Sequence, residues 1–456
     1  MTTGEDIFDQ AAGNIERLGL TEIPFTENTL DLESETRDRV FTGREKELRQ
    51  VFNLFQSRER RRILVYGQIG IGKSAFLLEV LSVLRRKRPK MLSTYISLPV
   101  NVDLATIALI AIAREMSDDD WAQRQLYQMG IPTDKIIKER SSEVGGNMGV
   151  IGKMGEKDFP ITKLQYPTVS LDTLLERAEK KYTDGVLIAI DDLDKRNPRE
   201  VRELMHDAQG MLKGRAWFML TGHSQGTIGD LLTVERGLFD LQIPLKELDR
   251  ETTYQMLINY LNSARIDNDC SDPNNPDAVL PFEPDAARRF CAVSLGKPRL
   301  FNRLGNKVLA TATDLQAEKI DSNILSQGLK AASRTLREQA ALNAKEEQIR
   351  LFLEQRGLLS DEEIAMEELE QLGVRSFSEL MPYLERLERA DLAQQRDRDN
   401  ATVYEPILLP AANENELPDS DDTPDEIILE GLKQGLHEAL TGQTLPLSAL
   451  DDEEET

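Results

Sequence analysis

The chain has 456 residues, of which 40% are hydrophobic and 30% charged, and its 80 acidic and 56 basic residues give a net charge of −24. This length leaves room for about three domains, and the composition excludes both a membrane-embedded and a wholly disordered chain. So large an acidic excess disfavours bulk binding to nucleic acid or to anionic membrane surfaces, unless a local basic patch outweighs it.

Cysteine and histidine are too few and too scattered for a disulfide framework or a cysteine-rich zinc site. The cysteines are Cys270 and Cys291, and there are three histidines; this usage fits a reducing compartment. The acidic start, MTTGEDIFDQ, is unlike a signal peptide, and the longest apolar run, 104–113, is shorter than the ~20 residues of a membrane span. We therefore expect a cytoplasmic protein without a membrane anchor.

Charge and patterning divide the chain into five predicted parts. Residues 1–40 are acidic, and residues 41–344 carry a net charge of +4. Residues 345–410 carry −8 and residues 411–456 carry −13. The predicted parts are an acidic amino-terminal arm (1–40), an α/β core (41–249), a helical lid (250–344), a winged-helix-like domain (345–410) and an acidic, largely disordered tail (411–456) with one short helix near 426–440.

Apolar runs rich in β-branched residues alternate with helical patterns between residues 41 and 249. This alternation is typical of a parallel sheet flanked by helices, here of the P-loop NTPase class. We expect strands at 63–66, 92–98, 186–190, 216–220 and 241–244.

A phosphate-binding loop follows the first predicted strand. It reads Gly67-Gln68-Ile69-Gly70-Ile71-Gly72-Lys73-Ser74 and fits the Walker A pattern G-x-x-x-x-G-K-[ST], with strand RILVY before it and helix SAFLLEVLSVL after it. Glycines let backbone amides surround a phosphate chain, while Lys73 reaches the outer phosphates and Ser74 is a ligand for Mg²⁺. The loop, with the adjoining Ala75, predicts binding of ATP and Mg²⁺.

Two further segments are weaker candidates. The basic run RRKRPK at 85–90, together with Arg58 and 60–62, could form a DNA-binding patch, but a solvated helix end is the favoured interpretation. The glycine-rich stretch 145–155 has no preceding strand or following helix, so it predicts a flexible insert rather than a second phosphate site.

An acidic pair ends the third predicted strand, in the sequence GVLIAIDD. Asp191 is placed to hold Mg²⁺ through water, and Asp192 to act as the general base that polarises the attacking water. The alternative, a buried strand followed by an acidic surface turn, is disfavoured by the phosphate loop upstream.

Beyond residue 250 the strand signals give way to helical periodicity. Helices expected at 346–355, 362–371 and 378–390, followed by short extended pieces around 397–400, have the order of a winged helix. A DNA-reading winged helix needs a basic third helix, whereas this one is rich in Glu. We therefore expect this domain to bind a protein partner or to pack on its own ATPase module. The acidic tail either extends the partner surface or is a solubilising segment without a partner.

Together with these motifs, three other sequences carry a family resemblance: FTGREKEL at 41–48, VERGLFD before the fifth strand, and Gly296-Lys297-Pro298-Arg299. Over roughly residues 20–340 the chain resembles the AAA+ ATPases, in the branch that contains the origin-recognition-type and STAND ATPases. The resemblance implies that Thr221 is sensor 1, Arg236 the arginine finger offered to a neighbouring subunit, and Arg299 sensor 2. It also places Thr42, Gly43 and Arg44 near the adenine.

Alternatives exist for both arginines: Arg236 could be a solvated helix-end residue and Arg299 part of a helix cap. Asp192 stands where most hydrolysing relatives have Glu, so its shorter reach predicts slow turnover, which suits a switch. We therefore expect a homo-oligomeric ATP-hydrolysing switch that signals to a protein. The alternatives are an origin-recognition- or transposition-type ATPase that contacts DNA through its central module only, and an adaptor with structural nucleotide.

Overall fold

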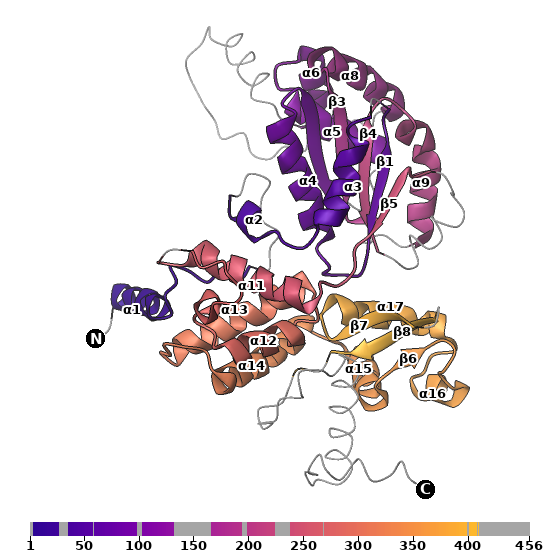
Figure 1. Cartoon of the computed structure of the whole chain (residues 1–456). Helices are drawn as coiled ribbons and strands as arrows, with labels where there is room; N and C mark the ends of the chain where they lie inside the picture. Colours follow the sequence, from indigo (N-terminus) through magenta and orange to yellow (C-terminus); the bar gives the residue numbers. More distant parts are fainter. Residues whose placement is uncertain are drawn as a thin grey trace, which may run out of the picture. The chain divides into compact units, whose positions relative to one another are not determined.

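The computed structural model describes residues 3–26, 35–57, 59–97, 103–131, 166–193, 198–223, 238–267, 269–398, 401–407 and 409 (Figure 1). The chain divides into two compact units. The α/β unit comprises 29–68 and 72–246, and the helical unit comprises 1–28, 69–71 and 247–456. The glycine-rich stretch 145–155 and the predicted tail, with its short helix, lie outside the described residues.

Five parallel strands form the sheet of the α/β unit, in the order β2-β3-β4-β1-β5. Each predicted strand agrees with an observed one to within two residues at either end, and helices flank the sheet (Figure 1). The predicted fold class is therefore confirmed for this part of the chain. The strands are β1 (Arg62–Tyr66), β2 (Met91–Ser97), β3 (Gly185–Asp191), β4 (Trp217–Gly222) and β5 (Leu241–Pro244).

The core of this unit lies between the sheet and its helices. Residues 186–190 of β3 are completely buried, as is typical of a parallel strand covered on both faces. The apolar run 104–113 forms α5, which packs against β2 and α8; a buried helix thus explains its hydrophobicity. The helices of the unit are α2 (Glu35–Val40), α3 (Glu45–Leu54), α4 (Lys73–Lys87), α5 (Leu104–Glu115), α6 (Asp120–Gln128), α8 (Pro167–Lys181) and α9 (Pro198–Leu212).

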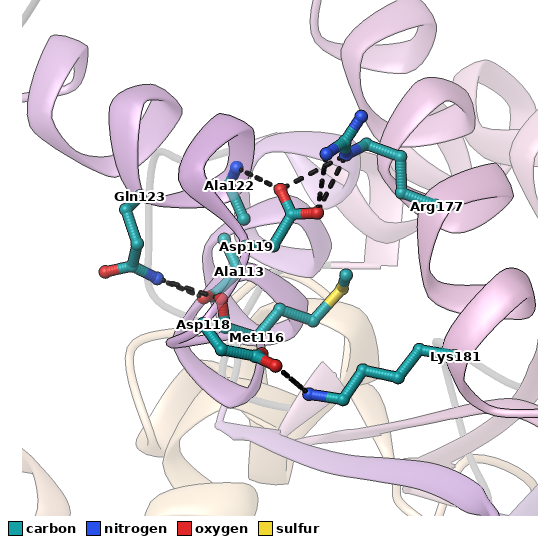
Figure 2. A network of polar contacts seen from close by, with 8 residues as sticks. All are labelled: Ala113, Met116, Asp118, Asp119, Ala122, Gln123, Arg177 and Lys181. Carbon is teal, nitrogen blue, oxygen red and sulfur yellow. Dashed lines mark hydrogen bonds and ion pairs between the residues drawn. The ribbon is translucent and has the colours of Figure 1, made fainter.

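Polar contacts join α5, α6 and α8, as Figure 2 shows. Asp119 caps α6 by accepting from the Ala122 N–H at 2.9 Å, and the same carboxylate accepts from Arg177 of α8 at 2.7–3.1 Å. Gln123 donates to the carbonyl groups of Ala113 and Met116 at the end of α5. The start of α6 is thereby fixed to both neighbouring helices.

Helices dominate the other unit, and the segment before residue 27 packs among them. Phe25 is buried, stacks on Tyr260 and meets Phe290 and Phe301 edge-on. The Phe25 carbonyl also accepts from Asn306. This part of the chain has α1 (Gly4–Arg17), α11 (Arg250–Ala264), η2 (Pro276–Val279), α12 (Pro284–Val293), α13 (Pro298–Asp314) and α14 (Ser322–Ala340).

The segment after α14 forms a small module with a three-stranded antiparallel sheet, in the order β6-β8-β7. Three helices were expected here and three are present, but the second begins at Met366 rather than at 362, because 359–365 form a strand and turns. The strand β6 was not predicted. The elements are α15 (Ala344–Arg356), β6 (Leu359–Ser360), α16 (Met366–Gln371), α17 (Phe377–Arg389), β7 (Ala393–Arg398) and β8 (Ala401–Pro406).

No helix in the described ranges is both long enough and apolar enough to cross a membrane.

Candidate nucleotide-binding site

The phosphate loop connects β1 to α4. Gly70 and Gly72 have φ angles of 78° and 96°, in the left-handed region that only glycine enters at little cost. Gly72 is also the N-cap of α4, so Lys73 is the first residue of the helix. Lys73 is nine-tenths buried, and its Nζ donates to the carbonyl oxygens of Gly67 and Gln68, each at 3.0 Å. The ammonium group therefore points into the loop, where a phosphate would replace these carbonyls.

Strand register brings two of the predicted site residues, Asp191 and Thr221, to one edge of the sheet. Val65 of β1 pairs with Thr221 of β4, and Ile190 of β3 pairs with Leu220, which places Asp191 beside Thr221. Neighbouring strands lie about 4.8 Å apart, so β3 is roughly 10 Å from the strand that leads into the phosphate loop. This gap suits a carboxylate that reaches a metal ion through water.

Asp191 is held by three donors. Thr221 Oγ1 donates to Asp191 Oδ1, as does the backbone N–H of Asp192 at 2.9 Å. Tyr95, on β2, donates its hydroxyl to Asp191 Oδ2 at 2.7 Å. Burial raises the pKa of Tyr95, and the Asp191 carboxylate raises it further, so this hydroxyl stays protonated and donates at neutral pH.

The neighbouring Asp192 has a φ of 66°, a left-handed conformation that Asp tolerates better than most residues. Its carboxylate accepts from the hydroxyl of Ser97, at the end of β2. Ser97 pairs with Asp191 across β2 and β3. The candidate general base is thus positioned by β2, the strand next to the one that carries Asp191.

The oxygen donors of this site fit Mg²⁺. A hydroxyl at the start of α4 (Ser74) and one carboxylate (Asp191) are hard oxygen ligands, and Mg²⁺ normally takes one or two such groups with waters and substrate phosphates. Among the described residues no group of three His, Cys, Asp or Glu side chains could hold a metal alone.

The residues expected near the adenine make contacts within their own unit. Arg44 is buried and donates to the carbonyl of Lys246 at 2.7 Å, while Thr42 donates to the carbonyl of Val40 at 2.9 Å. Gly43 has a φ of 77°. The GRE sequence thus anchors the start of α3 to the segment after β5. Its proximity to adenine stays a prediction.

Arg236 lies outside the described residues, whereas Arg299 lies at the start of α13 in the helical unit. Gly296 precedes it with a φ of 63°, and a Cβ there would approach the Leu248 carbonyl oxygen to 2.1 Å, so only glycine fits. The Arg299 guanidinium donates to the Asp391 carboxylate at 2.6 and 3.1 Å. In the same unit its backbone N–H donates to the Gly70 carbonyl at 3.2 Å.

The described arginines considered for DNA have acidic or polar partners in the α/β unit. Arg85 pairs with Glu115 and Arg86 with Asp38, while Arg88 contacts Gln56. The arginines before β1 behave in the same way. Arg60 pairs with Glu179, Arg61 with Glu59 and Asp240, and Arg62 with Asp240. These contacts offset much of the arginine charge, whereas Lys87 and Lys90 of the same run are exposed and Arg58 lies outside the described residues.

Comparison with known proteins agrees with this site. Residues 41–216 match the model of an ATPase domain found predominantly in Archaea. That segment, well under half of the chain, contains the phosphate loop and both aspartates. No curated protein matches the chain.

Several solved structures are similar at low sequence identity. One is Cdc6p of Pyrobaculum aerophilum, with 14% identity and a TM-score of 0.42, where the match covers 92% of this chain and 98% of that chain. Another is the Aeropyrum pernix ORC1 protein in complex with DNA, with 16% identity and a TM-score of 0.45, where the match covers 90% of this chain and 97% of that chain. A third is a RuvB mutant of Thermotoga maritima, with 16% identity and a TM-score of 0.40, where the match covers 80% of this chain and 93% of that chain. Because these sequence identities and TM-scores are low, the fold is assigned from the strand order and the phosphate loop described above.

Sequence reasoning identified the loop and the aspartates but missed Tyr95, Ser97 and Asp391. A signal for the first two exists: in TYIS they alternate along one strand and so share a face. Tyr95 and Ser97 reach the two aspartates only because β2 lies next to β3 in the sheet, and the sequence does not specify that strand order. Asp391 comes from a segment about 90 residues after Arg299, and nothing in its local sequence indicates the pairing.

Proposed function

We propose that the chain is a Mg²⁺-dependent ATPase that turns over slowly, assembles into a homo-oligomer through its ATPase module and passes its nucleotide state to a protein partner. The observation that supports ATP hydrolysis best lies in the α/β unit. Lys73 is directed into the phosphate loop, while Asp191 and Thr221 are hydrogen-bonded at the same sheet edge. The match to an ATPase domain over 41–216 agrees with this reading.

In the proposed reaction the phosphates of ATP replace the loop carbonyls as acceptors for Lys73. Ser74 and Asp191 hold Mg²⁺, which neutralises charge on the phosphates. A water oxygen bonds to the γ-phosphorus as the bond to the bridging oxygen breaks, and Asp192 accepts the proton of the water. Thr221 aligns this water in the role expected of sensor 1. Asp192 also accepts from Ser97, and the short reach of its side chain toward the water slows turnover.

Assembly and partner binding rest on other parts of the chain. The order helix, strand, helix, helix, strand, strand over 344–406 supports the winged-helix interpretation, and the acid-rich third helix suits a protein surface better than DNA. The alternative of a DNA-associated ATPase predicts ATP-dependent DNA binding that weakens steeply with salt. The carboxylate partners of the basic residues count against it.

The proposal is tested by measuring ATP affinity and the rate of ATP hydrolysis per subunit over a range of protein concentrations. Lys73→Ala removes charge-assisted bonds to phosphate, so ATP affinity should fall by about 10–100-fold. Lys87→Ala, at the exposed end of the same helix, is the matched control and should behave like wild type. The wild-type rate per subunit should rise with concentration, and that of Arg236→Ala should stay low and flat.

Two results would contradict separate parts of the proposal. Wild-type protein that neither binds nor hydrolyses ATP would contradict the ATPase. A flat wild-type rate that Arg236→Ala reproduces would leave the ATPase intact but contradict the shared-site assembly.

A further inference from the structure

Among the groups in the described residues that the proposed function leaves unused are the Tyr95 hydroxyl, the buried Lys297 ammonium group and the free thiol of Cys291. Only Tyr95 touches a residue of the proposed reaction. It lies on β2, where its register partner in β3 is Ala189, two residues before Asp191. Its hydroxyl therefore reaches the carboxylate from the side opposite to Thr221 of β4.

The acceptor positions of Asp191 can be counted. A carboxylate offers about four lone-pair positions, two on each oxygen. Oδ1 accepts from the Thr221 hydroxyl and from the Asp192 N–H, which uses both of its positions. Oδ2 accepts from Tyr95 and keeps one position. Asp191 is 2% exposed, so its surroundings, rather than bulk water, decide where that position points.

We propose that Tyr95 is a positioning residue for Mg²⁺: it fixes the rotation of the Asp191 carboxylate and leaves one acceptor position for a metal-bound water. Thr221 alone does not fix this rotation, because its contact and that of the Asp192 N–H both go to Oδ1 and leave Oδ2 without a protein donor. With Tyr95 in place, both oxygens are held from opposite strands. The inference rests on the proposed function and names the residue that orders its metal site.

Tyr95→Phe tests this role, because Phe keeps the ring and removes only the donor. The measurement is the gain in melting temperature at saturating ATP as Mg²⁺ is titrated, which reports metal binding without catalysis. Loss of a group that orients a metal ligand typically weakens metal binding 10–100-fold. The half-saturating Mg²⁺ concentration should therefore rise at least tenfold, while ATP affinity in excess EDTA stays unchanged.

Two controls separate this role from a purely structural one. Tyr260→Phe also removes a buried tyrosine hydroxyl, one that accepts from Asn302 in the helical unit, and should leave the Mg²⁺ titration unchanged. In the Asp191→Asn background, Tyr95→Phe should have no additional effect on the titration, because Tyr95 acts through that carboxylate.

The outcomes are distinguishable. If wild-type protein responds to ATP and Mg²⁺, and Tyr95→Phe responds at the same Mg²⁺ concentration, the positioning role is wrong and the ATPase proposal stands. A lower melting temperature of Tyr95→Phe without any change in the Mg²⁺ titration also overturns it. If wild-type protein shows no response to ATP, the proposed function itself fails.

Discussion

Asp192 combines a left-handed backbone with a carboxylate that is engaged by another strand. A non-glycine residue in this conformation costs of the order of 1 kcal/mol and persists only where its surroundings compensate. Here its N–H donates to Asp191 Oδ1 at 2.9 Å and to Thr221 Oγ1 at 3.3 Å. The turn after β3 is therefore shaped by the same groups that hold the Asp191 carboxylate.

Substitution of Asp192 tests whether it is the general base. Asp192→Asn should lower kcat at least 100-fold while ATP affinity changes little, since general-base catalysis contributes about 10²–10⁴-fold. Asp192→Glu should raise kcat above wild type, because the extra methylene extends the reach of the carboxylate. Single-turnover hydrolysis with ATP binding in parallel measures both. Equal rates in wild type and both variants would show that another group accepts the proton.

Among elements, α6 depends on the single carboxylate that caps it. Partial burial opposes ionisation of Asp119, but hydrogen bonds from Arg177 and from the Ala122 N–H outweigh it and hold the pKa of Asp119 below its usual range. A carboxyl whose pKa is lowered by folding stabilises the folded state above its unfolded pKa of about 3.9. This contribution is lost as the pH falls through the lower, folded-state value.

Asp119→Ala should therefore reduce stability by about 1–2 kcal/mol at pH 7, which combines the loss of an N-cap with the loss of the contact to α8. Calorimetry should show a melting temperature lower by a few degrees, and the difference should shrink below about pH 4. Asp118→Ala is the matched control: this adjacent carboxylate is 65% exposed and, within the described part of the chain, its side chain pairs only with Lys181, so little change is expected. Equal losses in the two variants would contradict the capping role.

The elements that the sequence predicted well are those with their own periodicity. Strands β1, β3 and β4 are mainly apolar runs with buried centres, and burial on both faces produces that pattern wherever the strands lie in the sheet. In the edge strand β5, by contrast, Ile243 is the one buried residue. The two-residue strand β6 has too few residues for any pattern, and it exists only because β8 pairs with it. Phe25 has no periodic context either. Its burial depends on Tyr260 and Phe301, which are more than 230 residues away in the sequence.

At the scale of the whole chain, the acidic excess has a local use in the helical unit. Asp391 is only 3% exposed at its side chain and accepts from both Arg299 and Arg303 of α13. The nearby Glu388 carboxylate accepts from the Ile69 N–H at 3.4 Å. Two acids of the carboxyl-terminal module thus engage groups that can also bind phosphate, namely an arginine and a loop amide. The charge pattern alone did not indicate this, since the acids around residue 390 look like a solvated helix end.

Asp391→Asn tests whether this pairing restrains Arg299. Removing a buried carboxylate that neutralises two arginines should lower the melting temperature, because the arginines lose their partner. If Arg299 contacts ATP in the manner expected of sensor 2, its release should at the same time raise ATP affinity, by about 3–10-fold for a partly exposed charged hydrogen bond.

A melting temperature that falls while ATP affinity rises is a combination that general destabilisation does not produce. Asp361→Asn removes one negative charge from an exposed position in the same module, so it controls for the change in net charge and should alter neither quantity. Calorimetry without nucleotide and titration with a fluorescent ATP analogue measure the two effects independently. If affinity falls together with stability in Asp391→Asn, the carboxylate supports the nucleotide site rather than competing with it, and Arg299 needs its partner in order to act.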